Sequence, residues 1–324
     1  MRRGDPGVPP EIVAALAEAS RIGAVGHVGP DGDALGSILG LTLAARAAGK
    51  EAWASFGEPF VLAPNLSFLD RSTLVSPSEL PEGLDVVVVC DTAVRDRLGS
   101  VAPRVDTARR IVVVDHHPAG DGFGDLHWVA PASATAEMVF RLVAALGWPI
   151  DEAVATALYV GIVTDTGRFQ YSATTPETHR VAALLLEAGV RTELVGEKLF
   201  EEAPFGYYRV VANVLGRAVL EPDVGPVGLV WSVMYRADLD EAGIGYEETD
   251  GLIDLVRMAR EAGVAALLKE RDRGRFKVSL RSRGSVDVGE LAARFDGGGH
   301  RNAAGFDAAG PPDEIVAKIR SALP

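Results

Sequence analysis

Short runs of β-branched residues alternate with Ala- and Leu-rich stretches through the first two-thirds of the chain. The apolar runs predict strands at residues 22–26, 51–56, 85–90 and 111–114, and the longer stretches predict helices at 34–48, 134–146, 151–163 and 176–188. Residues 86–90 and 111–114 are continuously apolar, as expected for central strands buried on both faces. This alternation is typical of a parallel sheet covered by helices, so we predict an α/β fold.

The alternation gives way near residues 190–204 to charged, helix-prone sequence. Beyond it, the pattern predicts helices at 207–218, 249–261, 286–294 and 312–322 and strands at 228–234, 263–269 and 275–281. A length of 324 residues suits two domains. We therefore predict a first domain at residues 1–190, a linker at 191–205 and a smaller α/β domain at 206–324.

The composition is that of a globular protein, with 48% apolar and 24% charged residues. No stretch of about 20 uninterrupted apolar residues could span a bilayer. No signal peptide is visible either, so we expect a cytoplasmic protein with no membrane partner. The single cysteine, Cys90, excludes an intramolecular disulfide and any multi-cysteine metal site. A metal would therefore have to bind His and carboxylate side chains.

The charge is distributed unevenly. The formal net charge is −13, yet residues 269–301 contain nine Lys or Arg against five Asp or Glu. An acidic chain is poorly suited to long duplex nucleic acid, whose binding requires an excess of Lys and Arg. A local basic patch instead fits a small anionic substrate, although ordinary solvated surface charge explains this feature equally well.

Carboxylates and imidazoles gather where the predicted strands end. They are His27, Asp31 and Asp33 after the first strand, Asp91 after the third, Asp115, His116 and His117 after the fourth, and Asp165 near the end of a helix. A single Asp in such a place is usually a cap or a turn residue, and a single His is usually structural. Ligands of open parallel sheets, however, bind beyond the carboxyl ends of the strands. Four segments that deliver such groups to one edge predict a cation site.

The residue types indicate which metals would bind. Asp31 and Asp33 flank Gly32 in a turn, so they can face neighbouring ions, and His27 can approach one of them. Oxygen and imidazole ligands without sulfur favour Mn²⁺ or Mg²⁺. Two ions roughly 3.5–4 Å apart can activate water and stabilise an in-line phosphoryl displacement. Phosphoester hydrolysis is the reaction that this pattern favours.

The C-terminal part carries a second polar pattern. Period-two alternation in the strand at 275–281 places Lys277, Ser279 and Arg281 on one face. Further along, Gly297, Gly298 and Gly299 precede His300. A glycine loop allows close backbone approach to a phosphate, although a triple glycine alone is more often a flexible turn.

These motifs together resemble those of the DHH phosphoesterase superfamily, in the same order. The first is His27-x-x-Pro30-Asp31-x-Asp33-Ala34-x-Gly36-Ser37, followed by Asp91, by Asp115-His116-His117 and by Asp165. The segment from Gly297 to Phe306 resembles the glycine-rich signature of the DHH-associated substrate domain. The resemblance covers nearly the whole chain.

The resemblance implies two divalent ions, Mn²⁺ in preference to Mg²⁺ or Co²⁺. One ion would be held by His27, Asp31 and Asp91, and the other by Asp33, Asp91, His116 and Asp165, with Asp91 bridging the two. Asp115 would orient the histidines, and His117 would face the substrate. Arg281, Gly297, Gly298, Gly299 and His300 would contact phosphate or nucleotide.

Within the superfamily, the chain is similar to compact NrnA-like members. These degrade very short RNA (nanoRNA) to mononucleotides and remove the 3′-phosphate of 3′-phosphoadenosine 5′-phosphate (pAp). Processive RecJ-type exonucleases carry additional domains, and family-II pyrophosphatases lack the glycine-rich signature. A cyclic-di-AMP or pApA phosphodiesterase is the nearest alternative, and a nucleotide-sensing module without catalysis is a further one. The expected partner is short RNA or a small nucleotide, and the sequence is compatible with a homodimer.

Overall fold

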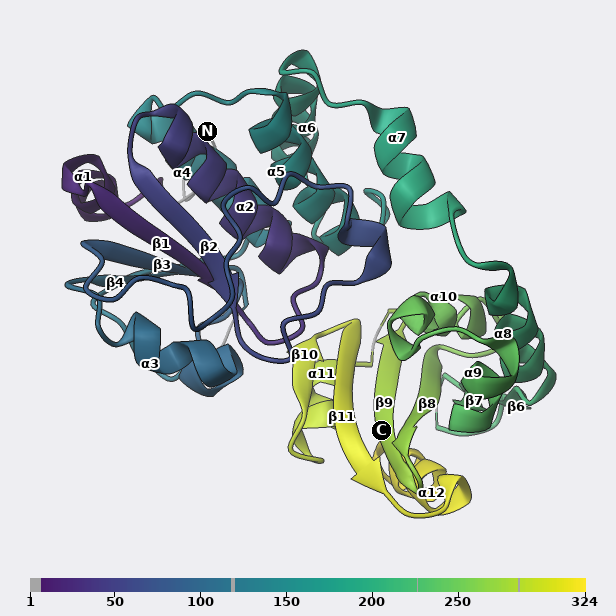
Figure 1. Cartoon of the computed structure of the whole chain (residues 1–324). Coiled ribbons are helices and arrows are strands. Elements are labelled where there is room, and N and C mark those ends of the chain that lie inside the picture. The colour runs from purple at the N-terminus through teal and green to yellow at the C-terminus, as the bar shows by residue number, and fades with distance from the viewer. Residues whose placement is uncertain (1–6, 118–119, 226, 285) are drawn as a thin grey trace. The chain divides into compact units, whose positions relative to one another are not determined.

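The computed structural model describes residues 7–117, 120–225, 227–284 and 286–324, without the side chain of His300. The chain divides into two compact units, Met1–Glu202 and Ala203–Pro324 (Figure 1). No helix in these described ranges is long and apolar enough to cross a membrane.

A parallel sheet of five strands forms the centre of the first unit. The strands are β1 (Arg21–Gly26), β2 (Glu51–Phe56), β3 (Val86–Cys90), β4 (Ile111–Asp115) and β5 (Leu126–Val129). Their order is β2-β1-β3-β4-β5, and every pairing is parallel. The predicted α/β fold with four parallel strands is confirmed. The sequence pattern did not predict β5, a short edge strand with only one fully buried residue, Trp128.

Helices cover both faces of this sheet (Figure 1). They are α1 (Pro10–Glu18), α2 (Gly32–Ala47), α3 (Ala102–Val105), α4 (Thr135–Leu146), α5 (Glu152–Asp165), α6 (Pro176–Glu187) and α7 (Thr192–Gly196), with the 3₁₀ helices η1 (Pro64–Leu66) and η2 (Arg95–Val101) and the π-helix η3 (Glu197–Glu201). One face packs against α1, α2, α4 and α5, and the other packs against η2 and α3. Helices α2 and α5 lie unusually close, because a Cβ on Gly36 would be 2.3 Å from the carbonyl oxygen of Ala157.

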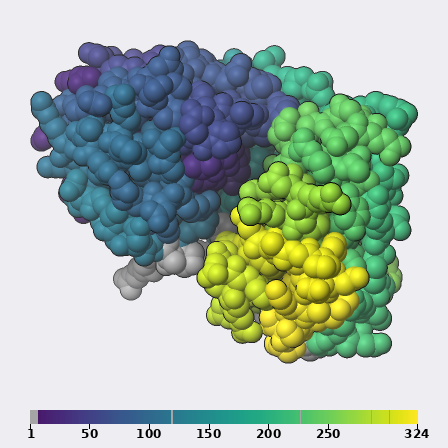
Figure 2. All heavy atoms as spheres, turned by 60° about the horizontal axis from the view of Figure 1, so that its bottom comes forward, coloured from purple at the N-terminus to yellow at the C-terminus, as the bar shows by residue number. Residues whose placement is uncertain are grey.

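The second unit contains a mixed sheet of six strands in the order β10-β11-β9-β8-β7-β6. The strands are β6 (Val219–Glu221), β7 (Leu229–Met234), β8 (Val264–Asp272), β9 (Arg275–Ser282), β10 (Gly298–His300) and β11 (Ala303–Ala309). The helices are α8 (Phe205–Gly216), α9 (Arg236–Ala242), α10 (Leu252–Val256), α11 (Val288–Ala293) and α12 (Pro312–Ala322), with the 3₁₀ helix η4 (Tyr246–Thr249). The C-terminal residues, yellow in Figure 2, form part of the surface of this unit.

The predicted helix at 249–261 is wrong in length, because only α10 forms there. Its buried residues are Leu252, Ile253 and Val256. If the helix continued for one further turn, Arg260 would lie on this buried side. A charged side chain is costly to bury in an apolar core, so the helix ends earlier. The alternation predicted for β9 is confirmed, since Phe276, Val278 and Leu280 are buried while the residues between them are partly exposed.

Candidate metal centre

The candidate residues of the first unit lie at the carboxyl edge of its sheet. His27 directly follows β1, Asp91 follows β3, and Asp115 is the last residue of β4. These three strands are adjacent and parallel, so their ends meet at one edge. Asp91 adopts a left-handed backbone with φ +62°, which is uncommon for a residue other than glycine and occurs often at functional sites.

Helices α2 and α5 bring the remaining carboxylates to this edge. Asp31 caps α2, because its Oδ1 accepts from the backbone N–H groups of Asp33 and Ala34 at 3.0 Å. Asp33 lies in the first turn of the same helix with only 1% of its surface exposed. Asp165 is the last residue of α5. The close packing of α2 on α5 explains why residues far apart in sequence share one site.

Among the residues that the structure describes, the ligand atoms form three groups whose members all lie within 4.8 Å of one another. The groups are His27, Asp31 and Asp91; Asp33, His116 and Asp165; and Asp91, His116 and His117. Asp91 joins the first group to the others. Its Oδ2 lies 3.5 Å from Nε2 of His27, and its Oδ1 lies 3.5 Å from Nε2 of His116.

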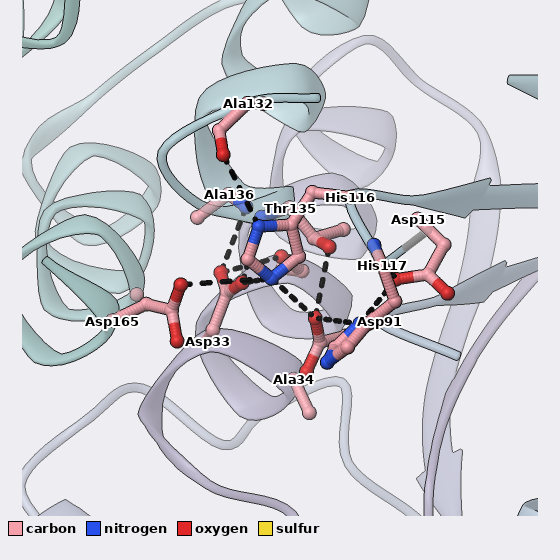
Figure 3. A network of polar contacts seen from close by, with 12 residues as sticks. Asp33, Ala34, Asp91, Asp115, His116, His117, Ala132, Thr135, Ala136 and Asp165 are labelled. Carbon is pink, nitrogen blue, oxygen red and sulfur yellow. Dashed lines mark hydrogen bonds and ion pairs between the residues drawn. The ribbon is translucent and has the colours of Figure 1, made fainter. Parts of the chain in front are cut away.

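Two imidazole rings are fixed with Nε2 towards these carboxylates. Nδ1 of His27 donates to the carbonyl of Val28 at 3.0 Å. Nδ1 of His116 donates to the carbonyl of Ala132 at 3.3 Å (Figure 3). A carbonyl only accepts, so Nδ1 carries the proton, and in a neutral ring Nε2 carries the lone pair. Ligating histidines are oriented in this way in metal proteins.

The spacing of the donor atoms fits a cation. Nε2 of His116 lies 3.5 Å from Oδ2 of Asp165 and 3.7 Å from Oδ2 of Asp33. These distances are too long for hydrogen bonds. Two ligands on one ion with bonds of about 2.0–2.2 Å would be about 3.0–3.6 Å apart. A lone pair that faces several carboxylate oxygens needs a positive charge between them, so this donor set suits a divalent ion.

Electrostatics at the site point in the same direction. Burial, followed by the charge of Asp91, raises the pKa of both Asp33 and Asp165 well above that of an ordinary Asp. Burial also acts to raise the pKa of Asp91, but the nearby imidazoles of His27, His117 and His116 outweigh it and lower that pKa. The carboxylates of this cluster therefore cannot all be ionised without a large free-energy cost unless a cation compensates their charge.

The third histidine has a carboxylate partner. Nδ1 of His117 donates to Oδ1 of Asp115 at 2.7 Å, and the His117 backbone N–H donates to the same oxygen at 3.1 Å. Burial acts to lower the pKa of His117, but its hydrogen bond with Asp115 and the charge of Asp91 outweigh this effect and raise it. The His117 side chain is 19% exposed, whereas that of His116 is 4% exposed. His117 is therefore the more accessible of the two.

The start of α4 contains site residues that the sequence analysis did not identify. The backbone N–H groups of Thr135 and Ala136 donate to the two oxygens of Asp33 at 2.7 and 2.8 Å. The Thr135 hydroxyl donates to Oδ1 of Asp91 at 2.9 Å. No signal for this was present in the sequence, because the helix was predicted to begin at residue 134, directly after Ser133. In the structure the N-cap is Ala134, which has no side chain to accept from the first amides, and Asp33 accepts from them instead.

In the second unit, the predicted glycine loop is instead mostly the edge strand β10, paired with β11. A Cβ on Gly297 would be 2.3 Å from the carbonyl of Gly305, and Gly299 has φ +140°. These two glycines are thus required by the hairpin itself. A Cβ on Gly298 would meet nothing within 4 Å, so the backbone is accessible there.

Arg281 and His300 occupy one row of this sheet. Arg281 on β9 pairs with Ala303 on β11, and Ala303 pairs with His300 on β10. The His300 side chain lies outside the described part of the structure. Nη1 of Arg281 donates to the carbonyl of Leu280 at 3.1 Å, and Nε lies 3.6 Å from Oδ1 of Asp254. The structure therefore brings the predicted residues of the second unit together in the sheet.

Comparison with known proteins identifies both parts of the chain. Residues 21–162 match the DHH family, N-terminal domain, and residues 230–323 match the DHHA1 domain. A crystal structure of an exopolyphosphatase-related protein from Bacteroides fragilis has the same fold, with a TM-score of 0.87 and 25% identity. That similarity covers 97% of this chain and 94% of the other.

Further relatives extend this result. The chain is 36% identical over 283 residues to the bifunctional oligoribonuclease and PAP phosphatase NrnA of Thermus thermophilus, covering 86% of this chain and 81% of the relative. It is 31% identical to the protein of the same name from Bacillus subtilis, covering 86% of each chain. The cyclic-di-AMP phosphodiesterase GdpP of Geobacillus thermodenitrificans is 30% identical, but only 44% of its length is covered. With the acidic and imidazole cluster at the sheet edge, these matches show that the chain belongs to the DHH family of phosphoesterases.

Proposed function

We propose that the cluster in the first unit holds two divalent metal ions. His27, Asp31 and Asp91 would bind one ion, and Asp33, Asp91, His116 and Asp165 would bind the other. The observation that carries this assignment is the orientation of Asp91, whose two oxygens each lie 3.5 Å from a different histidine. Mn²⁺ fits the mixture of carboxylate and imidazole ligands, and Mg²⁺ or Co²⁺ are the alternatives.

Two such ions supply an activated water and stabilise the oxygens of an in-line phosphoryl displacement. His117 would donate a proton to the leaving oxygen of the substrate, because it is the more exposed histidine. Asp115 would hold the ring of His117 in place through the 2.7 Å hydrogen bond. The same bond raises the pKa of His117 against the effect of burial, which keeps a proton available at that ring.

The substrate that we propose is a short oligoribonucleotide, hydrolysed to mononucleotides, or pAp, hydrolysed to AMP. Relatives that align over most of this chain are named oligoribonuclease and PAP phosphatase. In the second unit, Arg281, His300 and the accessible backbone at Gly298 would bind substrate phosphate. The net charge of −13 disfavours extended contacts with a long nucleic acid.

A cyclic-di-AMP or pApA phosphodiesterase is the second candidate. It is supported by the 30% identity to GdpP, which extends over 88% of this chain. The NrnA relatives are matched over a much larger share of their own length, so we place nanoRNA and pAp first.

The test is whether hydrolysis depends on metal. The purified protein is treated with EDTA, and its activity is measured before and after Mn²⁺ is added back. We expect two ions per chain and hydrolysis of pAp and dinucleotides only after reloading. Asp91→Asn should lose activity while the protein remains folded, because it removes one charge from a crowded cluster. Full hydrolysis in excess EDTA would contradict the proposal.

A further inference from the structure

We propose that Thr135 is a positioning residue of the metal centre, which sets the orientation of two metal-binding carboxylates at once. This inference rests on the proposed assignment of Asp33 and Asp91 as metal ligands. Thr135 belongs to none of the motifs recognised in the sequence.

The hydroxyl of Thr135 controls the rotation of Asp91. It is completely buried and donates to Oδ1 of Asp91 at 2.9 Å. That oxygen lies on the side of His116, while Oδ2 lies on the side of His27. A carboxylate that serves two ions must present one oxygen to each of them. A fixed donor on Oδ1 holds this orientation before any metal arrives.

The backbone of Thr135 controls the second carboxylate. Its N–H donates to Oδ2 of Asp33 at 2.7 Å, and the next N–H, of Ala136, donates to Oδ1 at 2.8 Å (Figure 3). These are the first amides of α4, a helix of 12 residues whose own N-cap provides no side-chain acceptor. Asp33 thus caps a helix that lies about 100 residues further along the chain.

The same segment also reaches a histidine. The carbonyl of Ala132, three residues before Thr135, accepts from Nδ1 of His116 at 3.3 Å. The segment 132–136 therefore contacts three of the proposed ligands, namely Asp33, Asp91 and His116. All three contacts leave donor atoms directed to the centre, so the start of α4 pre-organises the site without binding metal itself.

The test separates the hydroxyl from the backbone. Thr135→Val has nearly the same shape and keeps both backbone donors, but it removes the hydrogen bond to Asp91. Thr135→Ser restores a hydroxyl. Thr42→Val is the matched control, because Thr42 is also completely buried in the first unit and its hydroxyl donates to a helix carbonyl, that of Ile38, at 2.7 Å.

The measurements are Mn²⁺ binding to the EDTA-treated full-length chain by calorimetry and the electron paramagnetic resonance signal of a coupled Mn²⁺ pair. Loss of a partner that orients a ligand typically weakens metal binding about 10–100-fold. We expect this loss for Thr135→Val, together with a weaker pair signal. Thr135→Ser should recover most of the affinity, and Thr42→Val should bind like the unmodified protein.

The outcomes distinguish this inference from the proposed function. If the unmodified protein binds no pair of ions, the metal assignment itself is wrong. If it binds a pair and Thr135→Val binds that pair with unchanged affinity and an unchanged signal, only the role of Thr135 is overturned. A loss of affinity in Thr42→Val equal to that in Thr135→Val would also overturn it, because the effect would then be one of general stability.

Discussion

Nδ1 of His117 lies 2.7 Å from Oδ1 of Asp115, and this oxygen also accepts from the His117 backbone N–H. The pair is thus fixed at two points, as expected for a proton donor that must keep one orientation. If His117 protonates the leaving oxygen, His117→Asn should lower kcat on pAp or a dinucleotide by about 10²–10⁴-fold.

The same substitution should matter little for an activated substrate. A p-nitrophenyl ester of a nucleotide has a leaving group that departs without a proton. The measurement is kcat of the unmodified protein and of His117→Asn on both substrates. A much larger loss of kcat on pAp or the dinucleotide than on the p-nitrophenyl ester supports His117 as the proton donor. Equal losses on both would instead indicate that His117 acts on the metals or on substrate binding.

Gly161 on α5 lies against Asp33. A Cβ at this position would be 2.5 Å from Cβ of Ala136 and 2.9 Å from Oδ1 of Asp33. Gly161→Ala should therefore displace the carboxylate and weaken Mn²⁺ binding. A mutation that disturbs the partners of a ligand typically costs about 10–100-fold in affinity.

Gly196→Ala is the control for this effect, because a Cβ there meets nothing within 4 Å and its backbone φ is not positive. It should leave Mn²⁺ affinity unchanged, and helix propensity favours Ala over Gly at such a site. Isothermal titration of both variants makes the comparison. Unchanged Mn²⁺ affinity in Gly161→Ala would mean that Asp33 does not need its observed position.

Arg281 should contribute to substrate binding and not to metal binding. Arg281→Ala would remove a charge-assisted hydrogen bond to phosphate, worth about 1.5–3 kcal/mol, which would appear mainly in KM. Arg275→Ala removes the same charge from the exposed beginning of the same strand, and it should change KM little. The measurement is KM for a dinucleotide by steady-state kinetics. Equal KM values for the two variants would show that Arg281 does not bind substrate and that this basic face is ordinary solvated surface.

The sequence predicted the parts of this structure whose signals are local. Apolar runs located the four main strands of the first unit, and the residues just after them lie together in the structure. The edge strands β5, β6 and β10 were missed because they are short. Strand β11 was also missed, because it is rich in Ala and Gly and has no β-branched residue. Strand β10 includes two glycines, whose sequence signal is that of a turn.

The role of Thr135 could not be predicted, because its partners are distant in sequence. Asp91 is 44 residues from Thr135 and Asp33 is 102 residues away. Nothing in the residues around Thr135 indicates a carboxylate partner. That the N-cap is Ala134, which has no side-chain acceptor, is known only from the structure, because the predicted helix began at residue 134 after Ser133.

The stability of the second unit should depend on pH through Asp238. Burial acts to raise the pKa of this carboxyl, but hydrogen bonds from Arg217 and from the backbone N–H of Tyr235 outweigh it and lower that pKa. A lowered pKa in the folded state stabilises the protein above the unfolded pKa of about 3.9. That contribution is lost as the pH falls from there through the folded value.

Asp238→Asn isolates this contribution. The unmodified protein should be more stable than the variant near neutral pH, and the difference should shrink as the pH falls below about 4. Urea unfolding of both proteins at a series of pH values measures this difference in the free energy of unfolding. A difference that stays constant across this range would show that the charge of Asp238 contributes nothing.

The most direct test of the proposed function is a comparison of kcat/KM for Mn²⁺-loaded protein on pAp, pApA, cyclic di-AMP and RNAs from dinucleotides to long single strands. We predict the highest values for pAp and the shortest RNA, with mononucleotide products, and a steady fall as the RNA lengthens. Asp91→Asn should be inactive on every substrate. Values that rise with RNA length, or that are highest for cyclic di-AMP, would contradict the proposal that this chain hydrolyses nanoRNA and pAp.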